Sequence, residues 1–405
     1  MLCNNFYILT TNMWRRSLGI YPFRYNNQLE LLQSGNSFFE KLSELIYNAT
    51  TEIHLQIYIF EPDKTGIIIR DLLFAAAKKG VKIYVVLDAY GSKNFNISWQ
   101  KSFENAGIEI YFYSPIKFGN YLHMGMRLHH KIICVDGQYA LVGGINISDN
   151  YSAYTLQTPW LDFALYAQGK VVFDLLQISK QTLRKVSKYP KFKIKQETQK
   201  EHKPIITRVL QNNWVQAKFG ITHQYKQKIR KAEHEIILFA SYFIPSLALK
   251  RLLKKAAKRG VNVQVVLGSI SDVGLVKNAT EYFYADMLKA GIKLYEWKQS
   301  VLHAKVALID SDWLSVGSYN LNHLSDFGSI ECNIEVLDEE FCSLTNKKLK
   351  QLMDEGCESI SLEKFENRSK IFSKIYQAIC YGLVRLLLGF MFLLQSRNVK
   401  KKRYY

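Results

Sequence analysis

The chain has 405 residues and a formal net charge of +19, with 54 lysines and arginines against 35 aspartates and glutamates. Its hydrophobic share of 48% excludes a largely disordered protein and is sufficient for two compact domains. The positive charge indicates an anionic partner (nucleic acid, phospholipid headgroups or phosphorylated metabolites), unless it belongs to an inert basic surface. Charge alone does not choose among these.

The N-terminal residues contain no long apolar run before the basic pair Arg15–Arg16. They therefore lack the pattern of a signal peptide, and we interpret residues 1–25 as an N-terminal extension.

Two segments of the chain resemble each other in order and composition. Residues 75–92 read AAAKKGVKIYVVLDAYGS, and residues 255–272 read KAAKRGVNVQVVLGSISD. In each, a helix ends in a basic pair and a glycine that suits a C-terminal cap, and a run rich in Val or Ile predicts a buried strand. The match continues in AGIEIY at 106–111 and AGIKLY at 290–295. Such repetition indicates a duplicated domain.

We therefore predict an α/β fold of two homologous domains, each with a mixed sheet flanked by helices. The first spans residues 26–187 and the second residues 205–358. A polar, lysine-rich linker with prolines near both ends joins them at 188–204.

Each predicted domain carries one copy of the motif His-x-Lys-x-x-x-x-Asp, followed by glycine and asparagine at matching distances. Because side chains alternate along a strand, histidine and lysine point to one face and the residue between them to the other. Aspartate begins a turn, and the returning strand brings asparagine back to the same patch. One copy arises by chance in roughly a few per cent of such chains, but two in register make a purely structural explanation weak. The copies are His129, Lys131, Asp136, Gly143, Gly144 and Asn146, and His303, Lys305, Asp310, Gly317, Ser318 and Asn320.

These residue types suit chemistry at a phosphodiester. The anionic group repels nucleophiles, so its two non-bridging oxygens must be neutralised, which two lysines and two amide donors do without a metal. One histidine, neutral, attacks phosphorus, and the other, protonated, donates to the leaving alkoxide. We predict neither a metal nor another cofactor. The predicted catalytic residues are His129, Lys131, Asp136, His303, Lys305 and Asp310, and Asn146, Asn320 and Ser318 are predicted to bind phosphate.

A histidine in either role needs an acceptor on its other ring nitrogen. Two acidic residues recur at similar offsets after the motifs, Asp162 in PWLD and Glu331 in SIECNIE. We predict that these two carboxylates orient the histidines.

The C-terminal residues 359–405 are predicted to associate with membrane. Residues 375–394 read IYQAICYGLVRLLLGFMFLL, which as a helix would reach about 30 Å. A central Arg385 is costly inside lipid, so an interfacial helix or shallow hairpin competes with a full span, and a helix buried against the second domain is the alternative. The basic residues that follow suit anionic headgroups. They are Arg397, Lys400, Lys401, Lys402 and Arg403.

The paired motifs resemble the phospholipase D superfamily, and the resemblance covers roughly residues 31–335. Within the superfamily the chain is most similar to bacterial cardiolipin synthases, in their short, B-type-like form without paired N-terminal transmembrane helices. The segments that carry this similarity are IYIFEPDKTG at 57–66, DAYGS at 88–92, GGINIS at 143–148, YFIP at 242–245 and HAKVALIDSDWLSVGSYNL at 303–321.

The resemblance implies two domains whose motifs meet at one cleft. It implies attack by His129 to form a phosphatidyl-histidine, with His303 as acid and base, and resolution by the hydroxyl of phosphatidylglycerol or a related acceptor. It also implies phospholipid substrates, an anionic membrane surface as partner, no nucleic acid, and a location at the bacterial inner membrane, peripheral or tail-anchored, on the cytoplasmic face.

Three positions depart from the pattern of the resembling enzymes. Gly144 stands where the second copy has Ser318, which removes a hydroxyl donor from the first copy. His130 replaces a residue that is often arginine in relatives, and Gln56 replaces one that is often glutamate. None of these changes removes a core catalytic residue.

Three functions are compatible with these motifs. The first is a phosphatidyltransferase, and the second is a hydrolase of the same superfamily, either a phospholipase D or a nuclease. Water and alcohol compete for one intermediate, and no single residue decides between them. A nuclease would explain the charge but not the apolar tail. The third, a non-catalytic lipid-binding protein, would be expected to show a broken motif, and both are intact.

Overall fold

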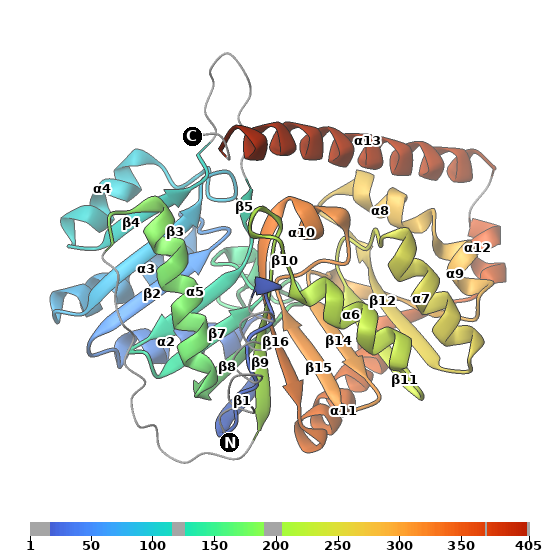
Figure 1. Ribbon diagram of the computed structural model, residues 1–405, viewed down its shortest axis with the longest axis horizontal. Coiled ribbons are helices and arrows are strands. Elements are labelled where there is room, and N and C mark those ends of the chain that lie inside the picture. Colours follow the sequence, from blue (N-terminus) through green and yellow to red (C-terminus); the bar gives the residue numbers. More distant parts are fainter. Residues whose placement is uncertain (1–16, 116–125, 190–204, 369–370, 403–405) are drawn as a thin grey trace, which may run out of the picture.

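The computed structural model describes residues 17–115, 126–189, 205–368 and 371–402. Two mixed β-sheets with flanking helices lie side by side, one in each half of the chain (Figure 1). The predicted α/β fold with two homologous halves is therefore confirmed. Most of the predicted linker, residues 190–204, lies outside the described residues, as do residues 1–16 of the predicted N-terminal extension.

The first sheet has seven strands in the order β1-β8-β7-β6-β2-β3-β4. The three strands β2, β3 and β4 are mutually parallel, and the remaining pairs are antiparallel. The strands are β1 (Asn27–Gln33), β2 (Glu52–Ile57), β3 (Lys82–Asp88), β4 (Glu109–Tyr113), β6 (Lys131–Val135), β7 (Tyr139–Gly143) and β8 (Phe163–Gly169).

The second sheet repeats this order as β9-β16-β15-β14-β11-β12-β13, and adds β10 and β17 at its two edges. A short strand from the first half, β5 (Arg127–Leu128), pairs with β16. The same order and the same parallel pairs confirm that the halves are a duplication. The strands are β9 (Ile206–Asn213), β10 (Lys218–Phe219), β11 (Glu235–Ala240), β12 (Asn262–Ile270), β13 (Lys293–Val301), β14 (Lys305–Ile309), β15 (Trp313–Gly317), β16 (Ser329–Leu337) and β17 (Cys357–Ile360).

Helices cover the sheets at the positions that the repeat predicts. α3 (Lys64–Lys78) and α7 (Leu247–Lys258) end before Gly80 and Gly260, which adopt φ of 92° and 94°. Glycine accepts this left-handed backbone without the strain of a Cβ atom, so the predicted caps are confirmed. The other helices are α2 (Asn36–Tyr47), α4 (Ile97–Asn105), α5 (Val171–Val186), α6 (Gly220–Lys231), α8 (Gly274–Glu281), α9 (Tyr284–Leu288), α10 (His323–Phe327), α11 (Glu339–Gly356), α12 (Leu362–Arg368) and α13 (Ile371–Lys402).

One hydrophobic cluster joins the halves. It contains inward-facing residues of both sheets, such as Val142 and Leu165 of the first and Val316 and Ile334 of the second. Burial of this apolar surface fixes the two sheets relative to each other, so the ends of their strands are held together.

The chain on either side of the halves also packs onto them. The N-terminal segment makes bridges from Ile20 and Arg24 to β9, so the described part of the predicted extension borders the second sheet. β17 continues past the boundary predicted at residue 358 and pairs with β13 as far as Ile360. Phe365 of α12 is buried in the hydrophobic cluster of the second half, so packing contacts with that half continue beyond residue 358.

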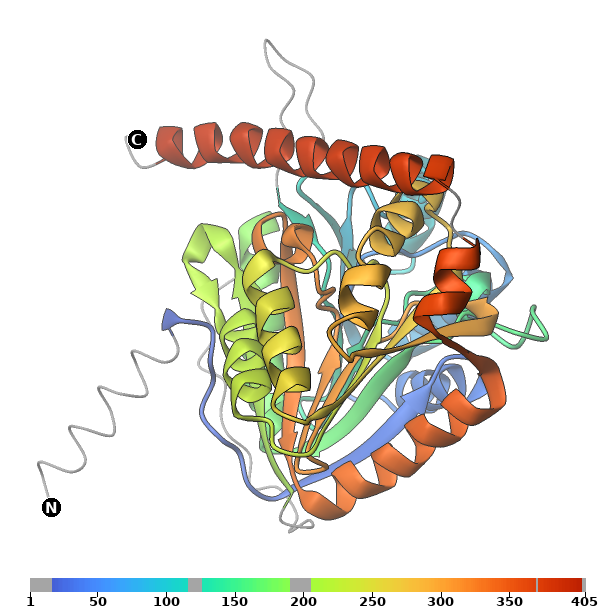
Figure 2. The ribbon, with the colours of Figure 1, turned by 90° about the vertical axis from the view of Figure 1, so that its right-hand side faces the viewer.

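The last helix, α13, lies across one end of the molecule (Figure 2). It contacts α8 and α10 of the second half. Within the described ranges no single helix has both the length and the apolar composition of a membrane span. A pair bent by 95°, α12 with residues 372–389, satisfies that test only when its members are combined.

Candidate active site

The two motif hairpins meet where the sheets adjoin. The backbone N–H of His129 donates to the carbonyl of Ile330 in the second half (3.1 Å). The backbone N–H of His303 donates to the carbonyl of Leu161 in the first half (2.8 Å). Each motif histidine is thus held by backbone from the other half, next to β16 or β8. The duplication produces a pseudo-symmetric pair of imidazoles at one place.

The carboxylates that orient these imidazoles also cross between the halves. His129 Nδ1 lies 2.9 Å from Glu331 Oε2, and His303 Nδ1 lies 2.6 Å from Asp162 Oδ2. All four side chains are buried or nearly so. Each carboxylate therefore contacts Nδ1 of the histidine of the opposite motif, and Nε2 of His303 lies 3.3 Å from Lys305 Nζ.

The two carboxylates are supported differently. Glu331 accepts hydrogen bonds from the hydroxyls of Ser318 (2.5 Å) and Ser325 (2.7 Å). Asp162 accepts one from the Phe163 N–H (2.7 Å), and a Cβ atom on Gly144 would overlap its carboxylate. The shorter aspartate thus occupies the space that the missing serine side chain leaves. Ser318, which the sequence assigns to phosphate binding, has its hydroxyl on Glu331 instead.

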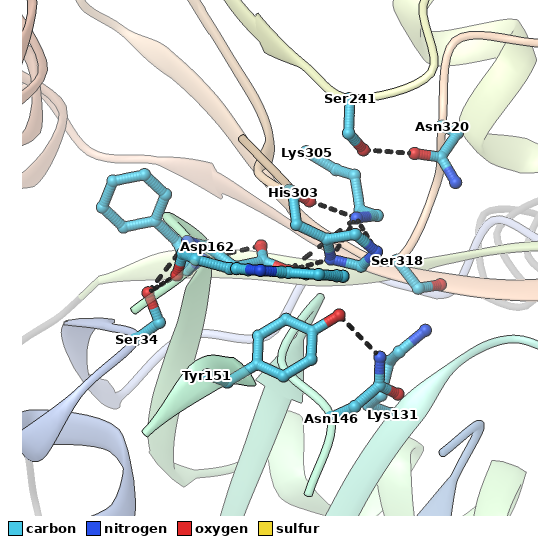
Figure 3. Close-up of polar contacts among 12 residues, drawn as sticks. Ser34, Lys131, Asn146, Tyr151, Asp162, Ser241, His303, Lys305, Ser318 and Asn320 are labelled. Atoms are coloured by element: carbon cyan, nitrogen blue, oxygen red, sulfur yellow. Dashed lines mark hydrogen bonds and ion pairs between the residues drawn. The ribbon is translucent and has the colours of Figure 1, made fainter. Parts of the chain in front are cut away.

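Both motif lysines are buried beside the histidines. Lys131 Nζ donates to the His129 carbonyl (2.6 Å), and Lys305 Nζ lies 2.8 Å from His303 Nδ1 and 3.7 Å from Asp162 Oδ2. Figure 3 shows His303 and Lys305 pointing from one half toward Lys131 of the other. Two ammonium groups therefore face one small volume.

The motif asparagines line the same pocket. Asn146 accepts from the Ile59 N–H (3.1 Å) and donates to the Tyr151 hydroxyl (3.0 Å). Asn320 accepts from the Ser241 hydroxyl (2.8 Å), as Figure 3 shows. These bonds fix both amides, which border the pocket next to the histidines.

The motif aspartates do not join this cluster. Asp136 follows the far end of β6, where its carboxylate accepts hydrogen bonds from the backbone N–H groups of residues 50, 51 and 52. Asp310 does the same for residues 233, 234 and 235. Both have a left-handed backbone, with φ of 53° and 52°, and begin the predicted turns. They border the turn between the two motif strands rather than the histidines, although the sequence groups them with the catalytic residues.

Burial determines the electrostatics of the site. It lowers the pKa of Lys131 to about 7 and that of Lys305 to about 8. It raises the pKa of Asp162 to about 6, against the opposing charge of Lys305. Burial and the neighbouring ammonium groups also lower the pKa of both histidines, although Glu331 opposes this at His129. These surroundings favour the neutral form of both imidazoles.

A pocket of about 920 Å³ opens onto both histidines. A second pocket of about 970 Å³ lies around the Asp310 turn and includes neither histidine. The first holds the paired chemistry and is therefore the candidate active site. Its polar lining includes His129, His303, Asn146, Asn320, Tyr58, Tyr151, Tyr242 and Arg127, and its apolar lining includes Ile244, Val273, Val276, Leu324, Val384 and Leu388.

Sequence reasoning missed the tyrosines. The rings of Tyr58 and Tyr242 lie edge-on to His129 and His303, with centroids 5.0 and 5.8 Å apart, and Tyr151 also contacts His303. Tyr58 and Tyr242 begin the similar segments YIFEP and YFIP, which were a usable signal. Tyr151 follows no repeated pattern that we identified.

Two of the departures from the family pattern are paired. His130 Nε2 lies 2.9 Å from Gln56 Oε1, and both side chains are buried. Burying two neutral partners avoids the desolvation cost of two charges.

No group of three or more His, Cys, Asp or Glu side chains suited to a metal ion occurs among the described residues.

Comparison with known proteins agrees with this geometry. The family model for the cardiolipin synthase, PLD-like domain, matches residues 42–157 and 225–353. The chain is 30% identical to cardiolipin synthase B of Salmonella typhimurium over 354 residues, which cover 86% of this chain and 85% of that one. It is 32% identical to cardiolipin synthase 1 of Staphylococcus epidermidis, over 83% of this chain and 69% of that one.

Among solved structures, the phosphatidylserine synthase of Haemophilus influenzae superposes with a TM-score of 0.68, at 14% identity. The match covers 93% of this chain and 97% of that one, and at this identity it supports the fold alone. The family model and the relatives go further. The chain belongs to the cardiolipin synthase family, the phosphatidyltransferases of the phospholipase D superfamily.

Proposed function

We propose that this enzyme transfers a phosphatidyl group from phosphatidylglycerol to the hydroxyl of a second phosphatidylglycerol or a related acceptor, through a covalent phosphohistidine. The observation that carries the proposal is the pair of crossed histidine–carboxylate contacts, His129–Glu331 and His303–Asp162, on one pocket. A single oriented imidazole would suit a base alone, whereas two suit a nucleophile and an acid.

The charges of the site support a phosphodiester as substrate. Lys131 and Lys305 are buried directly beside the two histidines, and Asn146 and Asn320 line the pocket. Preorganised donors of this kind stabilise the charge that develops on the non-bridging oxygens without reorganising. The substrate anion also raises the pKa of a nearby imidazole, so the second histidine gains its proton when the phosphodiester binds.

The reaction then has two balanced steps. His129 Nε2 forms a bond to phosphorus as the bond to the glycerol headgroup oxygen breaks, and His303 donates its proton to that oxygen. The acceptor hydroxyl next loses its proton to His303 while its oxygen bonds to phosphorus and the phosphorus–nitrogen bond breaks. The family resemblance supports His129 as the nucleophile, and Asp162 stabilises the charged form of His303.

The pocket supports transfer over hydrolysis. Its apolar lining on the second half suits a lipid acceptor and reduces access for water, which would otherwise compete for the phosphohistidine. We infer phospholipids as substrates and no nucleic acid. We also propose that the enzyme acts on the cytoplasmic face of the bacterial inner membrane, bound through its C-terminal residues.

The test incubates purified enzyme with phosphatidylglycerol and identifies products by mass spectrometry. We expect cardiolipin and glycerol from the native chain, and none from folded His129→Ala or His303→Ala. Because the phosphorus–nitrogen bond is labile in acid, the native chain is quenched during turnover with denaturant at neutral pH, and its peptides should carry a phosphatidyl mass on His129. His234→Ala, the same change at an exposed histidine, is the matched control. Phosphatidic acid as the main product, or turnover by either folded motif variant, would contradict the proposal.

A further inference from the structure

The helix α13 has apolar side chains on two faces. One face is turned toward the body of the protein, with Cys380 and Val384 buried and Tyr381 and Leu388 partly buried. The other face is exposed and also apolar. Its residues follow helical spacing and are Phe372, Ile375, Tyr376, Ile379, Leu383, Leu386 and Leu387, each about half exposed or more.

The inner face is fixed by specific contacts to the end of α8 and to the two residues that follow it. Tyr381 stacks on Tyr282, with ring centroids 4.8 Å apart and planes 12° apart, and it meets Phe283 edge-on at 4.9 Å. Gln377 donates to Glu281 Oε2 at 2.9 Å. These bonds and the burial of Cys380 hold the helix against the second half, so it is part of this fold and not a free tail.

The same inner face forms a wall of the active-site pocket. Val384 and Leu388 line the pocket that opens onto both histidines. Four apolar residues of the second half line the pocket with them. These are Val273 and Val276 at the start of α8, Ile244 and Leu324. The pocket therefore has a phosphate end at the histidines and an apolar end bounded by α13. These contacts favour the alternative predicted from the sequence, in which the apolar segment packs as a helix on the second domain.

We propose that α13 lies in the surface of a phospholipid bilayer by its outer face and forms, by its inner face, the wall of a groove for the acyl chains of the substrate. The phosphate sits at the histidines while its chains run along Val384 and Leu388. The proposal rests on the proposed function in one respect, that the substrate is a phospholipid. Beyond that function, the proposal assigns a binding site to the acyl chains of the substrate and a bilayer surface from which the substrate enters.

A lipid surface is the occupant that these residues favour. The outer stripe from Phe372 to Leu387 runs about 22 Å along the helix, interrupted by the exposed cations Lys374 and Arg385. Apolar residues with interspersed basic ones are typical of helices that lie in a headgroup layer. The stripe is also on the helix whose inner face borders the pocket, so a lipid would pass between surface and site without crossing water.

The first test concerns the outer face. Leu383→Glu with Leu386→Glu places two anions on the exposed stripe without touching the pocket. In flotation with vesicles of phosphatidylcholine and phosphatidylglycerol at 3:1, we expect about tenfold or greater loss of bound protein. Leu344→Glu on α11, an equally exposed leucine away from α13, is the control and should float like the native chain. Flotation needs no turnover, so it is independent of the proposed function.

The second test concerns the inner face. Leu388→Trp narrows the groove, so kcat/KM in detergent micelles should fall about tenfold more for an eighteen-carbon lipid than for a six-carbon one. Leu386→Trp, two residues away on the outer face, should leave this ratio unchanged. A native enzyme that turns over neither lipid would refute the proposed function. The flotation result would then still show whether the outer face of α13 binds the membrane surface.

Two results would overturn the inference. Vesicle binding by the double glutamate variant at the native level would exclude the outer stripe as the membrane contact. An equal effect of Leu388→Trp on both chain lengths would exclude an acyl groove along α13. Circular dichroism and thermal unfolding of each variant establish that it is folded before either result is read.

Discussion

His303 and Asp162 belong to different halves of the chain, yet their side chains meet at 2.6 Å between Nδ1 and Oδ2. In the reciprocal contact, Glu331 of the second half lies 2.9 Å from Nδ1 of His129 in the first half. Each half thus lacks the orienting group for its own histidine, so neither half alone forms a complete site. Any movement that separates the two sheets would misalign both imidazoles at once.

Removing the charge of one orienting residue should therefore impair catalysis more than folding. For Asp162→Asn we expect kcat to fall about 10²–10⁴-fold, because an amide neither selects the correct tautomer nor stabilises an imidazolium. KM should change much less, since Asp162 is hydrogen-bonded to His303 and not to the pocket surface. Steady-state kinetics on detergent-dispersed lipid measures this, and an unchanged kcat would show that the contact is merely structural.

The motif aspartates lead to the opposite expectation. Asp136→Asn weakens hydrogen bonds to three backbone N–H groups that hold the start of β2, and should lower the free energy of unfolding by about 1–3 kcal/mol. Its distance from the histidines predicts near-native kcat in the folded fraction. Urea unfolding and kinetics on the same preparation separate the two effects. Loss of kcat in fully folded protein would return Asp136 to the catalytic residues.

Much of the fold followed from the sequence because it rests on local patterns. Apolar runs, the glycine caps at Gly80 and Gly260, and the turns at Asp136 and Asp310 are each determined within a few residues. The duplication then required the two sheets to share one strand order. Short-range chemistry and repetition were sufficient for this level of description.

The crossed contacts were not readable, because offsets along the chain do not show which half supplies a partner. Asp162 and Glu331 were found by their repeated offsets, but their pairing with the opposite histidines depends on how two sheets pack. The bond between His130 and Gln56 is similar. Each looked like a separate departure from the family pattern, and only the alignment of neighbouring strands β2 and β6 places them together.

The pKa shifts predict a narrow pH profile. As pH rises through about 7 to 8, Lys131 and Lys305 lose the charge that neutralises the substrate, so kcat/KM should decline there. As pH falls through about 6, the Asp162 carboxylate gains a proton. It then no longer accepts a hydrogen bond from Nδ1 of His303, so kcat/KM should decline again. The optimum therefore lies between about pH 6 and 7. A profile that stays flat from about pH 5 to 9 would contradict this assignment.

Activity should not depend on a divalent metal ion. Lys131 and Lys305 supply, as fixed ammonium groups, the positive charge that a metal would otherwise bring to the phosphate oxygens. We expect EDTA to leave the initial rate within about twofold of its value without chelator. Abolition of turnover by EDTA, and its restoration by a divalent ion, would show that a metal takes part.

The final prediction concerns where the second half of the fold ends. A chain that stops after Glu358 lacks the buried Ile360 and Phe365, together with Arg368, which pairs with the buried Glu296 at 3.0 and 3.1 Å. Loss of two buried apolar side chains alone should lower the free energy of unfolding by about 3–6 kcal/mol. A chain that stops after Arg368 keeps these contacts and loses only α13.

We therefore expect the longer truncation to unfold cooperatively in urea below the native midpoint, because it loses the buried Cys380 and Val384 of α13, and the shorter one to be less stable still or insoluble. The difference arises because β17 completes the edge of the second sheet on β13, and α12 covers Tyr284, whose ring lies 5.3 Å from that of Phe365. A single change, Phe365→Ala in the full chain, should reproduce much of the loss, at about 3–5 kcal/mol. If both truncated chains unfold at the same midpoint, residues 359–368 contribute nothing to the domain, and the boundary predicted from the sequence at 358 stands.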